Sequence, residues 1–323
     1  MYNNIKLEKG LYTITGKTFT QALEALDPDS QYVGTELGKL DAFERQLKRF
    51  DIRIKGADSD KVEKFFVSTD SAVLFPEYVR RMIKAGMDEV SVIPNAAAAV
   101  TYTDSNDYRG LTVSTEETSS YVEEGGDVPV TTVRLNASNM ELCKYARILN
   151  CSYESIRKYR LSAFGVILKN LGASLSREVN RLVIDALADV AGQETQTGDI
   201  TYADITAFWG SMTDYNMNTM LCSPATMAAI LGLPEMKFCV GDYMSGGTVE
   251  TPYGVTLVKC PEITTFLCLG IDKDCAGEMV FGTDIIVDFD KLISTQCDEI
   301  SASITVGFSV LSNGAAKMLV QGS

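Results

Sequence analysis

Any acid–base or nucleophilic chemistry in this 323-residue sequence has to use carboxylates, lysines or cysteines, because the sequence contains no histidine. That absence removes Ser-His and Cys-His catalysis, imidazole metal ligation and the commonest proton shuttle of enzymes. The 43 acidic residues are scattered, and no pair of them stands in an apolar stretch that would tune a catalytic carboxylate. We therefore expect no catalytic residue.

The run from Lys9-Gly10 to Gly16-Lys17-Thr18 superficially suggests a phosphate-binding loop. Five residues separate its glycines where the P-loop has four, and no buried strand precedes it. No G-x-G-x-x-G motif, EF-hand pattern or metal-binding cysteine spacing is present either. The sequence thus predicts no cofactor site, no metal site and no enzyme.

The eight cysteines, at positions 143, 151, 222, 239, 260, 268, 275 and 297, form no C-x-x-C pair. Several lie in apolar runs such as Thr265-Phe266-Leu267-Cys268-Leu269-Gly270. We interpret them as reduced core residues of a cytosolic protein. Disulfides formed after release from a cell are the alternative.

Composition and charge limit the class of protein. A hydrophobic content of 46% and a charged content of 22% indicate a folded chain with a substantial core. The net charge of −14 argues against a general nucleic-acid binder, because phosphate affinity comes from clustered Lys and Arg. Neither an apolar signal segment after Met1 nor a membrane-spanning window is expected.

Two charged segments lack a core of their own in the sequence. Residues 90–138 read as a long, mostly polar β-hairpin, and residues 1–70 read as an extended arm with a basic stretch. The acidic candidates in the hairpin are Glu116, Glu117, Glu123, Glu124 and Asp127. The basic candidates in the arm are Arg45, Lys48, Arg49, Arg53 and Lys55. We expect both segments to pack on a neighbouring copy of the chain; the alternatives are a disordered surface loop and a solvated helix face.

One long helix, predicted between Tyr153 and Gly192, is the element around which the rest is arranged. Its apolar stripe consists of Leu161, Phe164, Leu168, Leu171, Leu175, Val179, Leu182, Ala186 and Val190. These steps of three and four residues match the helical period of about 3.6. Gly165 and Gly172 each cost about 1 kcal/mol there, so tertiary packing must support the helix.

The flanking segments predict further elements. A helix is expected from about Pro76 to Gly86. Residues 193–296 read as a compact α/β unit with helices capped by Thr201 and Ser223, and with short strands at 279–281 and 285–289. The alternating run Glu299–Leu311 predicts a long strand, which an Asn313-Gly314 turn would connect to a last strand at 316–320.

The order of these elements resembles the major capsid proteins of tailed bacteriophages, which have the Hong Kong 97 fold. The likeness rests on Val73-Leu74-Phe75-Pro76-Glu77-Tyr78-Val79 before the hairpin, and on Tyr121-Val122-Glu123-Glu124-Gly125-Gly126 within it. Met140-Glu141-Leu142-Cys143-Lys144-Tyr145-Ala146 precedes the long "spine" helix, and Ser223-Pro224-Ala225-Thr226 resembles the family's Asn-Pro-x-Thr helix start. The closing run Ile304-Thr305-Val306-Gly307-Phe308-Ser309-Val310 resembles its return strand. The likeness covers about residues 70–320.

The resemblance implies an α+β capsid fold with four parts. These are an N-terminal arm (1–70), a peripheral domain (71–89, 139–195 and 297–323), an extended hairpin or E-loop (90–138) and an inserted axial domain (196–296), with the spine helix in the peripheral domain. It further implies pentamers and hexamers that form the icosahedral head of a virion, assembled in the host bacterial cytoplasm around double-stranded DNA. Membrane association is not implied.

Two departures from the family's pattern bear on the expected cross-linking and partner proteins. Some family members cross-link subunits through a hairpin lysine, but residues 85–143 contain no lysine, so we do not expect that chemistry. Some begin with a long scaffolding segment; the 70-residue arm is short for that, so the resemblance implies a separate scaffolding protein, together with portal and decoration proteins. Two other readings stay open: a nanocompartment shell of the encapsulin type, and an α/β enzyme or ligand-binding protein with a hairpin lid.

Overall fold

The computed structural model describes residues 5–14, 17–105, 107–115, 121–126, 128, 130–135, 139–239 and 249–322. The chain divides into two compact units, which are described separately. Unit 1 comprises Met1–Glu89, Ala146–Leu175 and Ile285–Ser303. Unit 2 comprises Val90–Tyr145, Ser176–Asp284 and Ile304–Ser323.

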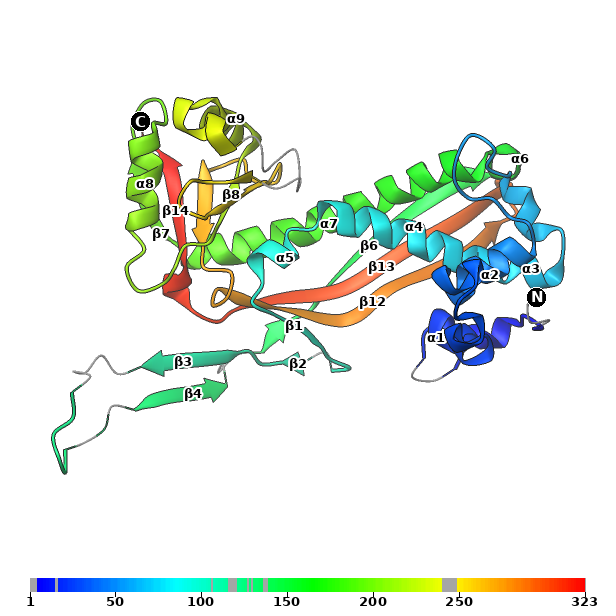
Figure 1. Cartoon of the computed structure of the whole chain (residues 1–323), viewed down its shortest axis with the longest axis horizontal. Coiled ribbons are helices and arrows are strands. Elements are labelled where there is room, and N and C mark those ends of the chain that lie inside the picture. Colours follow the sequence, from blue (N-terminus) through cyan, green and yellow to red (C-terminus); the bar gives the residue numbers. More distant parts are fainter. Residues whose placement is uncertain are drawn as a thin grey trace. The chain divides into compact units, whose positions relative to one another are not determined.

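Figure 1 labels the helices and strands along the chain. The helices are α1 (Phe19–Leu26), α2 (Ala42–Arg49), α3 (Thr69–Ala72), α4 (Leu74–Val90), α5 (Ile93–Ala96), α6 (Tyr153–Lys158), α7 (Leu161–Val190), α8 (Tyr202–Gly210) and α9 (Pro224–Gly232). The first strands are β1 (Ala99–Tyr102), β2 (Asp107–Tyr108), β3 (Leu111–Thr115), β4 (Thr131–Leu135), β5 (Met140–Glu141), β6 (Cys143–Ser152) and β7 (Gly192–Gln196). The remaining strands are β8 (Thr219–Cys222), β9 (Val249–Glu250), β10 (Thr256–Lys259), β11 (Cys268–Ile271), β12 (Gly277–Leu292), β13 (Cys297–Val310) and β14 (Ala316–Gln321).

The N-terminal segment in unit 1 is folded, and the expectation of an extended arm was wrong. Helices α1 and α2 each begin with a capping box, formed by Thr18 with Gln21 and by Asp41 with Glu44. They bury apolar residues of their own, among them Leu23, Phe43 and Leu47. Local caps and a small apolar core therefore hold these helices without a neighbouring subunit.

Helix α4 anchors this folded segment through a charged network. Arg81 binds Glu77 at 2.9 Å and reaches Asp41 at 2.5 Å. Thr20 of α1 donates a hydrogen bond to the same Glu77 carboxylate at 2.8 Å. Because Glu77 is buried, these contacts fix α1 and the start of α2 on the surface of α4.

The predicted long helix is confirmed as the 30-residue α7. Its first half belongs to unit 1, where it packs so closely on α4 that a methyl group on Gly86 would lie 2.0 Å from the Lys169 carbonyl oxygen. Gly86 therefore allows the two helices to approach. The sequence had suggested that Gly86 ends α4, but the helix continues to Val90. The segment from Tyr153 to Lys158 is a separate short helix, because the backbone is extended at Tyr159.

A four-stranded sheet has the strand order β1-β12-β13-β6. Strand β12 runs for 16 residues, whereas the sequence predicted two short strands within it. Gly282 lies between those two predicted strands, but it does not interrupt the ladder. The long strand predicted at 299–311 is confirmed as β13.

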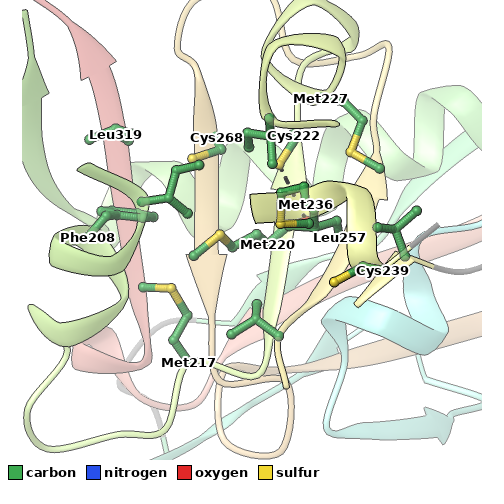
Figure 2. Packing of buried hydrophobic residues seen from close by; sticks show 14 of the residues in the cluster. Phe208, Met217, Met220, Cys222, Met227, Met236, Cys239, Leu257, Cys268 and Leu319 are labelled. Atoms are coloured by element: carbon green, nitrogen blue, oxygen red, sulfur yellow. Dashed lines mark hydrogen bonds between the residues drawn. The ribbon is translucent and has the colours of Figure 1, made fainter. Parts of the chain in front are cut away.

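Unit 2 contains a six-stranded sheet with the order β7-β14-β11-β8-β10-β9. Helices α8 and α9 begin at the predicted caps, Thr201 and Ser223. The last strand predicted at 316–320 is confirmed as β14, which pairs with β11 and β7 in this sheet and not with β13. Figure 2 shows the core beside this sheet, where Phe208 of α8 and Met227 of α9 gather with the strand residues Met220 and Leu257.

The predicted hairpin consists of two short ladders in unit 2. Strands β3 and β4 pair antiparallel from Leu111 opposite Leu135 to Thr115 opposite Thr131. Strands β2 and β5 pair antiparallel as well. The hairpin does not begin at residue 90 as predicted, because Val90 ends α4 and Ile93–Ala96 form α5.

Candidate functional site

The described residues show no arrangement typical of a catalytic or metal site. No three His, Cys, Asp or Glu side chains among them lie close enough to hold a metal ion. The strongly shifted tyrosines make structural contacts: burial raises the pKa of Tyr12 and of Tyr78. The Tyr12 hydroxyl donates to the Val73 carbonyl at 2.8 Å, and the Tyr78 hydroxyl donates to the Leu161 carbonyl at 2.6 Å. No described helix is long and apolar enough to cross a membrane.

Arg45, a predicted inter-subunit residue, lies inside the folded arm. Its side chain is 0% exposed. Its guanidinium donates to Asp27 at 3.1 Å, to Asp29 at 2.5 Å and to the Leu40 carbonyl at 2.7 Å. These contacts occupy the Arg45 charge within its own chain, so we withdraw this residue from the assembly surface.

The rest of the basic stretch is closer to solvent. Arg49 is half-buried and donates to the Ile5 carbonyl at 2.7 Å and to Gln46 at 3.1 Å. Lys48, Arg53 and Lys55 are exposed. These three residues, which we call the basic patch, remain available to meet an acidic partner.

Two of the five acidic candidates lie in the part of the hairpin that the structure describes. Glu116, Glu117 and Asp127 lie outside the described residues. Glu123 and Glu124 are exposed in a turn that a hydrogen bond from the Gly126 amide to the Glu123 carbonyl closes at 2.9 Å.

The hairpin also exposes apolar side chains. Tyr121 is 77% exposed and Leu135 is 63% exposed, and Val128, Val130 and Val133 are exposed with them. Isolated exposed apolar residues are ordinary, but five of them within one hairpin are typical of a surface that a partner covers. The sequence predicted a mostly polar hairpin without a core of its own, and it did not predict these exposed apolar side chains.

An open groove in unit 1 was not predicted. It encloses about 1170 Å³ beside Phe66, Phe75 and Phe289. Its remaining lining residues are Lys9, Tyr12, Glu63, Ala72, Val73, Pro76, Ile156, Val287, Asp290, Lys291, Asp298, Glu299 and Ile300. Since four separate segments of the chain build its walls, no local pattern indicated it.

The comparison with known families decides the class of protein. The family described as phage capsid protein matches residues 141–289, from β5 to within β12. This match identifies the region as that of a phage capsid protein. The match includes the whole of α7 and of strands β8 to β11, which are the elements that the resemblance had named as the spine helix and the axial domain.

Solved structures confirm the Hong Kong 97-like fold of this capsid protein. A chain from Mycobacterium phage Bobi is 12% identical, with a TM-score of 0.54 over 72% of this chain and 91% of that chain. The capsid of a native GTA particle is 12% identical, with a TM-score of 0.53 over 74% and 91%. A virus-like particle from Pyrococcus furiosus is 12% identical, with a TM-score of 0.55 over 75% and 98%. No curated protein matches the sequence.

The family match confirms three expectations from the sequence. The capsid protein has a structural role and not an enzymatic one, it forms phage heads, and its place is the virion. Assembly with copies of itself follows from that role. The reading as an α/β enzyme with a hairpin lid receives no support from any of the matches.

Proposed function

We propose that this capsid protein forms pentamers and hexamers, in which each hairpin lies across a neighbouring subunit, and that the resulting icosahedral shell encloses double-stranded DNA without sequence-specific contacts. The observation that supports the hairpin contact most directly is the group of exposed apolar residues from Tyr121 to Leu135. Covering them would remove apolar surface from water, at about 25 cal/mol for each Å² buried.

Opposite charges would orient the hairpin in the proposed contact. Glu123 and Glu124 of the hairpin would face the basic patch, Lys48, Arg53 and Lys55, of the next subunit. Exposed pairs of this kind contribute little stability in water, but they select orientation and speed association, and salt weakens them. The net charge of −14 also suits a container whose inner wall should not hold the genome tightly.

The proposed partners rest on the arm. Residues 19–49 are engaged in contacts with their own chain, so they resemble a docked subdomain more than a free scaffolding segment. We therefore propose a separate scaffolding protein and a portal, with a decoration protein as a further partner. The peripheral and axial domains keep their proposed boundaries, except that β7 and β14 join the six-stranded sheet of the axial domain and β12 pairs with β13 in the four-stranded sheet.

Negative-stain electron microscopy of the purified chain, together with its elution volume at low and moderate salt, tests this function. We expect closed shells or free pentamers and hexamers, either alone or on co-expression with the scaffolding protein. Purified particles should contain DNA when they come from infected cells; a protein cargo in its place would favour the nanocompartment. A chain that stays monomeric with that scaffolding protein and binds a small molecule would contradict the proposal.

A further inference from the structure

Two cysteines face each other in the axial sheet. Cys222 ends β8, Cys268 begins β11, and the antiparallel register places one directly opposite the other. The next pair along the ladder is hydrogen-bonded, because the Ser223 amide donates to the Leu267 carbonyl at 3.0 Å. Since hydrogen-bonded and non-hydrogen-bonded pairs alternate, the cysteines occupy a non-hydrogen-bonded position, where Cα atoms lie about 4.5 Å apart.

That spacing suits a disulfide, which takes Cα separations of about 4.4 to 6.8 Å. Opposite residues in a sheet also point to the same face, so the two thiols share one environment. Figure 2 shows both side chains next to each other in the core of unit 2. Cys222 is 0% exposed and Cys268 is 3% exposed.

Cys260 provides a natural contrast to this pair. It is also buried, and its amide donates to the Cys222 carbonyl at 2.8 Å. However, the parallel register aligns Lys259 with Cys222, so Cys260 lies one residue further on and points to the opposite face of the sheet. Backbone proximity alone therefore does not bring the Cys260 thiol to Cys222.

We propose that Cys222 and Cys268 form a disulfide when the capsid protein leaves the reducing bacterial cytosol, and that this bond stabilises the axial domain of the released particle. The timing rests on the proposed function, because a shell is released into oxidising surroundings. The bond itself depends only on the fold of unit 2.

The oxidant is a small-molecule disulfide, RS–SR. The Cys222 thiolate attacks one of its sulfurs, a mixed disulfide forms, and one RSH leaves with the Cys222 proton. The Cys268 thiolate then attacks the Cys222 sulfur and releases the second RSH with the Cys268 proton. Two protein thiols are oxidised, and one RS–SR is reduced to two RSH.

The surroundings make this reaction slow. Contact with the Cys268 thiol and burial raise the pKa of Cys222 well above its ordinary value, which disfavours the reactive thiolate. Entry of the oxidant also requires local opening of the sheet. Reaction should therefore be faster at higher pH, and once formed the bond should resist reduction.

The test is to incubate the folded protein with oxidised glutathione at pH 8, then denature it, alkylate free thiols and map peptides by mass spectrometry. We expect a Cys222–Cys268 peptide pair that has lost two hydrogens, and a melting temperature several degrees higher than before oxidation. Cys260→Ala should keep both effects, and Cys268→Ala should lose both. The mapping needs no variant, so it remains decisive if a variant does not fold.

The timing is tested on particles. Lysis into an excess of alkylating reagent should trap both cysteines as thiols, and released particles kept with oxidised glutathione should contain the bond. Full alkylation of Cys222 and Cys268 after prolonged oxidation would overturn the proposal. Because the soluble subunit is tested as well, failure of the chain to assemble leaves this result interpretable.

Discussion

Gly172 of α7 lies against the backbone of Ile83 in α4, where a methyl group would stand 2.0 Å from the Ile83 carbonyl oxygen. The glycine that weakens α7 as an isolated helix is thus the one that lets α4 approach it. Gly86 makes the reciprocal contact from α4 with the Lys169 carbonyl. Together these glycines join the two helices closely within unit 1.

Gly172→Ala should therefore destabilise the capsid protein despite the better helix propensity of alanine. We expect the free energy of unfolding to fall by about 3 kcal/mol, because neither backbone can move without separating the helices. Gly210→Ala is the matched control: no atom lies within 4 Å of the added methyl, so its effect should stay within about 1 kcal/mol. Urea unfolding followed by circular dichroism compares the two, and equal midpoints would contradict the packing argument.

The buried guanidinium of Arg45 leads to a second prediction. Arg45→Met should leave the nearly buried Asp27 with a much poorer set of partners, at a cost of about 3 kcal/mol in unfolding free energy. Lys48→Met, on the exposed side of the same helix, should change it by less than about 0.5 kcal/mol. Thermal unfolding of both variants measures the difference. An Arg45→Met melting curve that overlays the wild type would show that the buried network is not needed.

Helix α7 and Arg45 show which features of the structure the sequence could predict and which it could not. The apolar stripe and the capping residues are local signals, and they located α7, α8 and α9 correctly. Arg45 is buried because it pairs with Asp27 and Asp29, which come close to it only after the arm folds. No local pattern indicates this pairing, so the sequence predicted that the whole basic segment is exposed. The strands that pair with β14 could not be predicted from the local sequence either, because an Asn-Gly turn is compatible with a hairpin but does not require one.

The third prediction concerns the free energy of unfolding at alkaline pH and rests on Tyr253. Burial raises the pKa of Tyr253 to about 12, whereas an unfolded tyrosine ionises near 10. Between these values the unfolded chain releases a proton that the folded chain keeps, so the free energy of unfolding should fall as the pH rises from about 10 to about 12. Tyr253→Phe should make this fall less steep. The test is urea unfolding from pH 8 to 11; an unchanged slope in the variant would exclude this tyrosine as a source.

The proposed hairpin contact makes the fourth prediction. Reversing Glu123 and Glu124 to lysine should impair shell assembly while the subunit stays folded, because both side chains are exposed and the mutant hairpin would repel the basic patch of its neighbour. Glu123→Gln with Glu124→Gln removes the charge without reversing it and should have a smaller effect. Particle yield by electron microscopy and subunit folding by circular dichroism measure the two requirements separately.

A compensating change makes this test specific to the proposed pairing. Lys48→Glu, Arg53→Glu and Lys55→Glu should impair assembly by themselves, and combined with the two lysine substitutions in the hairpin they should restore particles. The rescue should weaken as salt rises, because exposed charges are screened over about 8 Å at physiological ionic strength. Normal particles from the variant with Glu123→Lys and Glu124→Lys would contradict the charge argument. Loss of particles without rescue by the compensating substitutions would place the partner of the hairpin elsewhere on the neighbouring subunit.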